Sequence, residues 1–292
     1  MIIKPPSKPS CQSTPPQSLR QRIDKLIEAV QFGWVRGASW KDCARLAYYA
    51  DLKSSLVFRG WTRFLPERLL AFSIKATGNT RFRISAYDNG WDAPTIAAFF
   101  SPRSRIVPAG LPPLQPKVIY DLGANVGIAS LYFATLYPDA QIYGFEPLPS
   151  NYELCVRNFK NLPKARVFPW AVGSRSEVMA FDCNEDPQGG HLQATPGNPK
   201  LQPGNPINVQ VYSMADLIRV QKLDPPEFVK IDVEGAELEV LRGMGEAIQS
   251  VKRMFVETHG ATLKEECLKW MRQQGFQIRP ASNPNALWGD QG

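Results

Sequence analysis

The sequence predicts an α/β fold, with a mostly parallel β-sheet flanked by helices and a mainly helical N-terminal extension in front of it. From residue 117 onward, short apolar runs alternate with segments of helical periodicity, which is typical of β-α-β units. The chain has 292 residues, 43% of them hydrophobic and 21% charged. It is therefore large enough to bury a core without disulfides or a metal ion.

The alternation follows a proline-rich connector, residues 102–116, where we place a domain boundary. We expect residues 1–16 to be a disordered tail and residues 17–116 to form a helical or mixed extension that caps the domain 117–292. Helical spacing of apolar residues predicts two helices over 17–50. The further strands expected are 82–87, 118–120, 141–145, 166–170, 228–231 and 254–257, and the further helices are one entered at Asp92 and those at 127–137, 150–160, 213–221, 235–250 and 262–273.

Charge, cysteine content and hydropathy narrow the class of protein. Residues 1–116 hold 17 basic and 7 acidic residues, net +10, whereas residues 117–292 are net −3. The five cysteines form no C-x-x-C pair, and no apolar run reaches the roughly 18 residues of a membrane span. We therefore expect a cytoplasmic protein with reduced thiols and no membrane span. The sequence specifies no oligomeric state.

A turn of small residues follows the first strand of the domain. It contains Asp121, Gly123, Ala124, Asn125 and Gly127, and a helix is expected to begin directly after it. Small residues let the backbone approach a ligand closely, and the helix N-terminus offers free N–H groups. Turns of this kind also occur for tight packing alone. A ligand site at this turn therefore needs further evidence, which the next strand supplies.

Glu146 ends that next strand, about 20 residues beyond the turn, where a carboxylate can accept both hydroxyls of a ribose. The turn lacks the G-x-G-x-x-G pattern that faces a pyrophosphate, and the chain has no G-x-x-x-x-G-K-[ST] run for ATP. The carboxylate of Asp121 would repel a pyrophosphate but suits a cation. S-adenosylmethionine, which carries a sulfonium and an ammonium group, therefore fits these motifs better than NAD does.

Four runs of the chain resemble the FkbM-type family of S-adenosylmethionine-dependent methyltransferases: VIYDLGANVGIASLYFATLYPDAQIYGFEPLPSNYELCVRNF, WAVGS, FVKIDVEGAELEVLRG and FVETHG. The resemblance covers roughly residues 117–260. It implies a Rossmann-like class I methyltransferase fold with a seven-stranded sheet and one antiparallel strand near its edge. It also implies O-methylation of a hydroxyl on a small molecule, a natural product or a glycan, with S-adenosylhomocysteine as the other product. Residues 1–116 lie outside it, so it does not identify the acceptor.

The resemblance also implies which residues bind the cofactor, and each part of the cofactor has its own set. These are Asp121, Gly123, Asn125 and Gly127, with Ala124 in the same turn, for the methionine part, Glu146 for the ribose, Pro147 and Leu148 for the adenine edge, Ala171 and Val172 for the adenine face, and Asp232 as a further contact.

The candidate catalytic residues end two further strands. Asp232 and Glu234 follow the fourth strand of the domain and His259 follows the fifth, so all three are expected at the crevice where parallel strands end. A hydroxyl needs a positioned base to lose its proton, and a histidine pKa near 6.5 suits that role. We predict that His259 accepts the proton, with Asp232 positioning it and Glu234 as the next candidate.

Two other interpretations of this group stay open. Asp232 could instead cap the helix expected from residue 235, with Glu234 and Glu237 favouring the N-terminal dipole of that helix. Asp232, Glu234 and His259 could also hold a divalent metal ion. Because nothing in their spacing requires an ion, we predict no metal site.

Two segments outside these motifs concern the acceptor. Residues 184–206 include nine Gly or Pro among 23 residues, which predicts a mobile lid with His191 as a substrate contact. The basic, aromatic-rich N-terminal part is interpreted as a cap that contributes to the acceptor site. It could instead bind RNA or an anionic glycan, although no RNA-binding motif supports that. An RNA methyltransferase and a non-catalytic nucleoside-binding protein are therefore the alternatives to the small-molecule or glycan enzyme.

Overall fold

The computed structural model describes most of the chain from residue 69 onward. The tail 1–16 and most of the two helices expected over 17–50 lie outside the described residues. The described residues are 69–75, 81–87, 92–100, 106–183 without 109 and 161, 191–192, and 205–291 without 282, together with isolated positions between 31 and 43.

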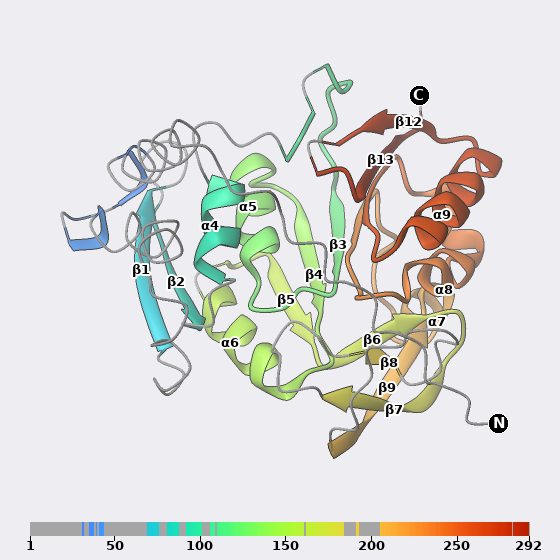
Figure 1. Ribbon diagram of the computed structural model, residues 1–292, viewed down its shortest axis with the longest axis horizontal. Coiled ribbons are helices and arrows are strands. Elements are labelled where there is room, and N and C mark those ends of the chain that lie inside the picture. The colour runs from blue at the N-terminus through green and yellow to red at the C-terminus, as the bar shows by residue number, and fades with distance from the viewer. Residues whose placement is uncertain are drawn as a thin grey trace, which may run out of the picture.

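A seven-stranded sheet forms the centre of the molecule, in the order β12-β13-β11-β10-β3-β4-β5 (Figure 1). At one edge, β13 (Ala286–Asp290) pairs antiparallel with β11, and β12 (Gln277–Pro280) pairs antiparallel with β13. The predicted α/β fold with one antiparallel strand near the edge of a seven-stranded sheet is confirmed. The five parallel strands are β3 (Val118–Leu122), β4 (Gln141–Phe145), β5 (Ala165–Phe168), β10 (Phe228–Ile231) and β11 (Arg253–Glu257).

Helices cover both faces of this sheet, and the alternation of side chains along β3 shows why. Ile119 packs in one apolar cluster with Phe133 of α5, whereas Tyr120 packs in another with Leu241 of α8 and Met271 of α9. All five residues of β3 are therefore buried. The helices are α4 (Asp92–Phe100), α5 (Ile128–Leu136), α6 (Pro149–Phe159), α7 (Met214–Arg219), α8 (Glu237–Arg242) and α9 (Ala261–Gln273), with the 3-10 helix η3 (Gly245–Gln249).

The strand expected at 166–170 is in fact two strands in different sheets. β5 ends at Phe168 and β6 (Trp170–Gly173) begins after Pro169, which has no backbone N–H to donate to a ladder. β6 pairs with β9 (Asn205–Ser213) in a four-stranded sheet of order β6-β9-β7-β8. The sequence did not predict this sheet, which lies next to the end of β5 (Figure 1).

The other two strands of this sheet bear on the segment expected to be a lid. β7 (Glu177–Cys183) pairs with both β9 and β8 (His191–Leu192), and His191 lies opposite Asp182 in the register. The backbone at His191 is therefore in a strand. Residues 184–190 and 193–204 lie outside the described residues, so the lid and the substrate contact of His191 stay predictions.

The single helix expected over 235–250 is interrupted at Gly243. α8 ends at Arg242 and η3 follows from Gly245. A Cβ on Gly243 would lie 1.9 Å from the carbonyl oxygen of Gly173, so the backbone of β6 passes too close for any side chain. The break between α8 and η3 therefore lets β6 of the four-stranded sheet pack directly against Gly243.

The described part of the N-terminal extension shares a core with the domain that follows it. A hairpin of β1 (Leu69–Lys75) and β2 (Arg81–Tyr87), of which only the second strand was predicted, leads into α4. Apolar side chains of this hairpin and of α4 pack in one cluster with residues of α5 and α6. Asn158 of α6 also accepts from the Ser85 N–H (2.7 Å) and donates to the Ser85 carbonyl (2.8 Å). The extension is therefore packed on the domain, with α4 next to α5 (Figure 1).

The proline-rich connector is anchored to the edge of the main sheet. Arg253 of β11, 3% exposed, pairs with Asp290 of β13 at 3.0 Å and donates to the Pro112 carbonyl at 2.6 Å. The indole N–H of Trp288 donates to the Ile106 carbonyl at 2.9 Å. None of the helices in the described part of the chain combines the length and hydropathy of a membrane-spanning segment.

Candidate active site

The first cleft lies where β3, β4 and β10 end, and β6 forms part of its wall. Leu148, Trp170 and Phe181 make most of its wall apolar, and Glu146 supplies a carboxylate. The residues predicted for the two sides of an adenine ring line the same space. They are Pro147, Leu148, Ala171 and Val172.

Glu146 is held in place by the backbone around it. Its Oε2 accepts the N–H of Asn125 at 2.8 Å, and its Oε1 accepts the N–H of Leu148 at 3.0 Å. The side chain is 6% exposed, and this burial raises the pKa of Glu146 to about 7, although the two N–H donors oppose the rise. Each carboxylate oxygen keeps acceptor capacity beyond one N–H, so hydrogen-bond donors from a ligand would stabilise the charged form.

The turn after β3 needs its first glycine for close packing. Gly123 has φ +73°, and a Cβ there would lie 1.8 Å from the carbonyl oxygen of Asp232. Gly127 is equally constrained, because a Cβ would lie 2.9 Å from both Cys155 Sγ and Phe159 Cε1 of α6. Gly123 lines the first cleft, whereas Gly127 faces α6 and lines neither cleft of the site.

Asp121 lies beneath the turn and does not line either cleft. It is fully buried, and its Oδ2 accepts the hydroxyl of Ser130 at 2.6 Å. The Lys230 ammonium is 3.2 Å from Asp121 Oδ1 and 3.2 Å from Asp232 Oδ2, and it donates to the Gly123 carbonyl at 2.8 Å. The structure therefore gives Asp121 an indirect position, in which it holds Lys230 and through it the turn.

Sequence reasoning assigned no role to Lys230, although one signal was present. It is a lysine inside an otherwise apolar four-residue strand, and an aspartate follows two residues later. Burial lowers the pKa of Lys230, but the charges of Asp121 and Asp232 outweigh it and raise the pKa above its usual value. Lys230 is therefore charged at every physiological pH.

A second cleft adjoins the first. The two share Gly123, Asn125, Asp232 and Glu234, so these residues mark where the clefts meet. Thr95 and Phe99 of α4 form part of the second cleft, together with Ala124, Glu257 and His259. The N-terminal extension thus contributes to this cleft through a helix that sequence reasoning did not assign to the site.

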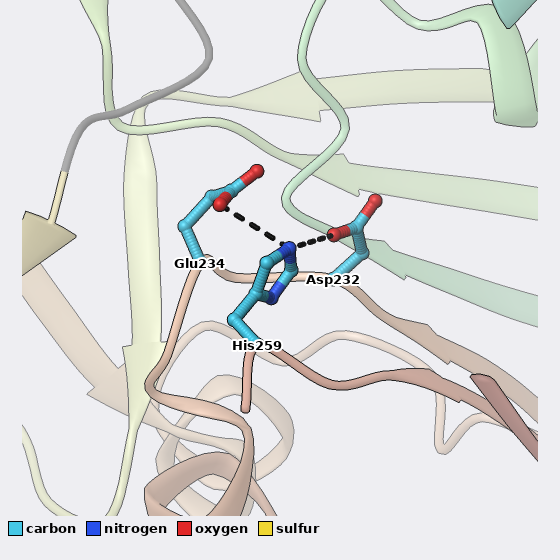
Figure 2. A group of neighbouring side chains, drawn as sticks. All are labelled: Asp232, Glu234 and His259. Carbon is cyan, nitrogen blue, oxygen red and sulfur yellow. Dashed lines mark ion pairs between the residues drawn. The ribbon is translucent and has the colours of Figure 1, made fainter. Parts of the chain in front are cut away.

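His259 lies among three carboxylates at the ends of β10 and β11. Its Nε2 is 3.2 Å from Glu234 Oε2 and 3.9 Å from Asp232 Oδ1, as the dashed lines in Figure 2 show. Its Nδ1 is 2.9 Å from Oε1 of Glu237, the first residue of α8. The structure therefore brings together the three residues predicted for catalysis and adds Glu237 to them.

These neighbours change the protonation of the site. Burial lowers the pKa of His259, but the hydrogen bond to Glu237 and the charges of Glu234, Glu237 and Asp232 outweigh it and raise the pKa to about 9. The expected value near 6.5 is therefore corrected upward, and His259 is an imidazolium at neutral pH in the free protein. Burial raises the pKa of Glu234 to about 7, which the charge of His259 partly opposes.

The structure contradicts one of the other two interpretations of this group, the helix cap, and does not require the other, a metal site. Asp232 does not cap α8, because Ala236 occupies the N-cap position and the Asp232 carboxylate pairs with Lys230. Asp232, Glu234 and His259 each offer a potential metal ligand atom, and these atoms lie within 4.8 Å of one another. An imidazolium between carboxylates accounts for the same arrangement, so the geometry does not require an ion.

The model of the FkbM methyltransferase domain matches residues 121–278, more than half of the chain. The chain belongs to the FkbM methyltransferase family. The matched segment contains the turn after β3, Glu146, the Asp232 region and His259, so every side chain of the site except those of α4 lies inside it.

Several relatives of this FkbM-family protein are themselves named methyltransferases. The hexuronic acid methyltransferase AglP of Haloferax volcanii is 29% identical over 182 residues, covering 58% of this chain and 72% of that protein. The 2-O-methyltransferase NoeI of Sinorhizobium fredii is 27% identical over 159 residues, covering 51% and 65%. A crystal structure of an FkbM methyltransferase from Methylobacillus flagellatus is 16% identical with a TM-score of 0.46, over 69% of this chain and 54% of that one.

Proposed function

We propose that this methyltransferase uses S-adenosylmethionine to methylate a hydroxyl oxygen on a small molecule or glycan. The observation that carries the proposal is the meeting of the two clefts at Asp232 and Glu234, beside His259. The first cleft offers an apolar slot and a buried carboxylate, and the second offers a histidine among carboxylates. The name of AglP, a hexuronic acid methyltransferase, supports a sugar derivative as the acceptor, and that of NoeI, a 2-O-methyltransferase, supports oxygen as the methylated atom.

The residues of the first cleft fit the cofactor. Glu146 would hold the ribose hydroxyls, Pro147 and Leu148 the adenine edge, and Ala171 and Val172 the adenine face. The fit rests on Glu146, whose buried carboxylate already takes one N–H on each oxygen and can accept two further donors from a diol. The methionine part would lie toward Gly123 and Asn125, next to the carboxylates of Asp232 and Glu234.

The chain's own residues would align the acceptor and remove its proton. S-adenosylmethionine supplies an electrophilic methyl group on a sulfonium. Asp232 and Glu234 place negative charge where that cation would lie, and His259 Nε2, once neutral, accepts the proton of the acceptor hydroxyl. Asp121 holds Lys230, and Lys230, which also lines the second cleft, holds the Gly123 carbonyl and Asp232 in position. Catalysis of this kind depends mainly on alignment.

The first test measures cofactor affinity in Glu146→Ala. We expect the dissociation constant for S-adenosylmethionine to rise at least about tenfold, because two hydrogen bonds to a charged acceptor, each of about 1.5–3 kcal/mol, would be lost. Titration calorimetry on folded protein gives this value directly. Glu153→Ala is the matched control, since Glu153 is an exposed residue of α6 close in sequence and is expected to leave the affinity unchanged.

Two outcomes of this titration, and one of a turnover assay, would contradict the proposal. Unchanged affinity in folded Glu146→Ala would remove the ribose assignment. Tight binding of NAD by the wild-type protein, with no binding of S-adenosylmethionine, would replace the methyl-transfer function by a dehydrogenase one. Binding of S-adenosylmethionine without turnover on any acceptor would support the non-catalytic alternative.

The alternative acceptor, RNA, is tested by the salt dependence of binding. The net charge of +10 in residues 1–116 predicts electrostatic binding to polyanions that weakens steeply with salt. Four described carboxylates line the second cleft, against one lysine, Lys230, and this excess of negative charge disfavours a phosphate backbone at the site of transfer; they are Asp92, Asp232, Glu234 and Glu257. We therefore expect RNA binding to vanish near physiological salt in a filter-binding titration. A specific RNA bound with nanomolar affinity there would establish the RNA alternative instead.

A further inference from the structure

Glu237 is a fully buried carboxylate beside His259 that lines neither cleft. Its exposed fraction is 0%, and it lines none of the space assigned above to cofactor or acceptor. Its Oε1 lies 2.9 Å from His259 Nδ1 and accepts the N–H of Gly235 at 3.0 Å. Its Oε2 has no hydrogen-bond partner among the described residues. A buried charge with one free oxygen is costly, so a role for that charge has to be sought.

The contact with Nδ1 determines which nitrogen of His259 can act. An ionised carboxylate has no proton to give, so the Nδ1 atom must keep its proton in order to bond to Glu237. Nε2 also faces a carboxylate, but Glu234 Oε2 lies 3.2 Å away on a side chain that is 32% exposed, whereas Glu237 Oε1 lies 2.9 Å from Nδ1 and is fully buried. The shorter, buried contact keeps its proton, so when the ring becomes neutral the proton leaves Nε2, on the side of Glu234 and Asp232. With the opposite tautomer, Nε2 would carry the proton and could accept none from an acceptor hydroxyl.

The contact with Gly235 extends the same control to the turn that carries Glu234. Glu234 has φ +52° and Gly235 has φ +105°, both in the left-handed region that favours glycine. Glu237 Oε1 accepts the N–H of Gly235 and so ties this turn to the start of α8. One carboxylate oxygen thus fixes both the ring of His259 and the backbone beside Glu234.

The geometry points to Glu237 as the positioning residue of the active site, a buried carboxylate that fixes the Nδ1–H tautomer of His259 and leaves Nε2 free to accept the acceptor's proton. It acts through His259 and the Gly235 turn rather than on a ligand. The role of this tautomer in proton transfer rests on the proposed function. The tautomer itself is inferred from the contacts of His259 alone.

Other charged and titratable groups also face this pair. Asp232 and Glu234 lie on the Nε2 side of the ring. The negative charge of Glu237 acts on the buried thiol of Cys267 on α9, while the charges of Glu257 and His259 act on each other. Lys230 pairs with Asp232 at 3.2 Å. Among the described residues, the ion pairs of His259 place Glu237 on Nδ1 and the other two carboxylates on Nε2, so the effect of Glu237 can be separated from theirs.

The test is Glu237→Gln, which keeps the size of the side chain and removes its charge. The chain has two histidines, so ¹⁵N-histidine spectra contain two rings, and a His191→Gln background, used for the spectra alone and not for turnover, leaves only His259. In the wild type we expect the Nδ1–H form in the neutral state. In Glu237→Gln we expect a mixture of tautomers and a proton affinity of His259 lower by at least about tenfold, because a nearby negative charge is gone. We expect turnover to fall at least about tenfold with cofactor affinity unchanged.

Glu239→Gln is the matched control on the same helix. Its side chain is 46% exposed and pairs with Arg242, so this variant should leave the ring spectrum and turnover unchanged. Glu237→Asp retains the charge but shortens the side chain, and it should keep more of the proton affinity of His259 than Glu237→Gln does. This order of variants distinguishes an electrostatic role from a packing role.

The spectra and the kinetics answer separate questions. A wild-type tautomer in folded Glu237→Gln would overturn the inference, as would unfolding of both variants, which would make Glu237 a folding determinant. A changed tautomer in a protein that binds no S-adenosylmethionine would support the positioning role of Glu237 and overturn the proposed function instead. A changed tautomer with full turnover would overturn the link between Glu237 and the reaction.

Discussion

Replacing Lys230 with methionine is expected to lower the free energy of unfolding by about 3–5 kcal/mol, as is usual when one partner of a buried ion pair is removed. Asp121 would keep its charge in a fully buried position, with the Ser130 hydroxyl as its remaining side-chain partner. The Gly123 carbonyl would also lose its donor. Chemical denaturation, read by circular dichroism, measures the change.

Two further variants show that the effect comes from the stranded charge of Asp121. Lys252→Met removes a lysine that is 55% exposed and pairs with Glu227 at the surface, so it should cost at most about 1 kcal/mol. Asp121→Asn combined with Lys230→Met removes both charges and should recover part of the loss. If Lys230→Met is as stable as Lys252→Met, the buried pair does not support the turn after β3.

Lys230→Met should also weaken cofactor binding in whatever fraction remains folded. The ammonium joins the Gly123 carbonyl and Asp232, and both of these residues line the first cleft. This link also explains why the sequence of β10, Phe-Val-Lys-Ile, tolerates a lysine in a strand whose four residues are all buried. The contacts of Lys230 are therefore expected to contribute both to the stability of the fold and to cofactor binding.

The main sheet was predictable because its strands follow local patterns. β4 has the bounds expected from its apolar run, and α9 begins within one residue of the expected start. β6 and β9 were not predictable in this way, because the break at Pro169 and the pairing of residues 170–173 with 210–213 depend on contacts between distant segments. Local periodicity identifies a strand but not the sheet to which it belongs.

Some residues of the site could likewise be predicted from local patterns, and one could not. Glu146, Asp232, Glu234 and His259 stand at strand ends, a position that sequence patterns mark, and the structure places all of them around the clefts. Glu237 looked like an ordinary acidic residue in the first turn of a helix, where such residues are common. Its contact with His259 spans 22 residues and depends on how α8 packs, so sequence spacing alone did not reveal it.

His259→Ala is expected to lower turnover by about 10²–10⁴-fold, the usual contribution of a positioned general base. Cofactor affinity should stay within a few-fold, because His259 lines the second cleft and not the first. The variant leaves Glu237 without its partner, so His259→Gln, which can still donate a hydrogen bond, is measured beside it. Single-turnover kinetics with a saturating cofactor separates the chemical step from binding.

The pH dependence of the wild-type enzyme gives the same assignment an independent check. The base must be neutral to accept a proton, and the pKa of His259 is about 9 in the free protein. The value of kcat/KM, which reports on the free enzyme, should therefore fall about tenfold for each pH unit below 9. A cation bound beside Asp232 and Glu234 offsets their charge and lowers the pKa of His259, so kcat should reach its plateau at a lower pH than kcat/KM does.

The two measurements together decide which group takes the proton. If His259→Ala keeps full turnover and kcat/KM falls only below pH 7, Glu234 is the base, because burial raises its pKa to about 7 and its carboxylate borders both clefts. If a chelator abolishes the activity and Mg²⁺ restores it, Asp232, Glu234 and His259 are metal ligands and the prediction of no metal is wrong. If turnover falls, the kcat/KM profile breaks near pH 9 and chelators have no effect, His259 is the base and its three carboxylate neighbours set the pH at which it works.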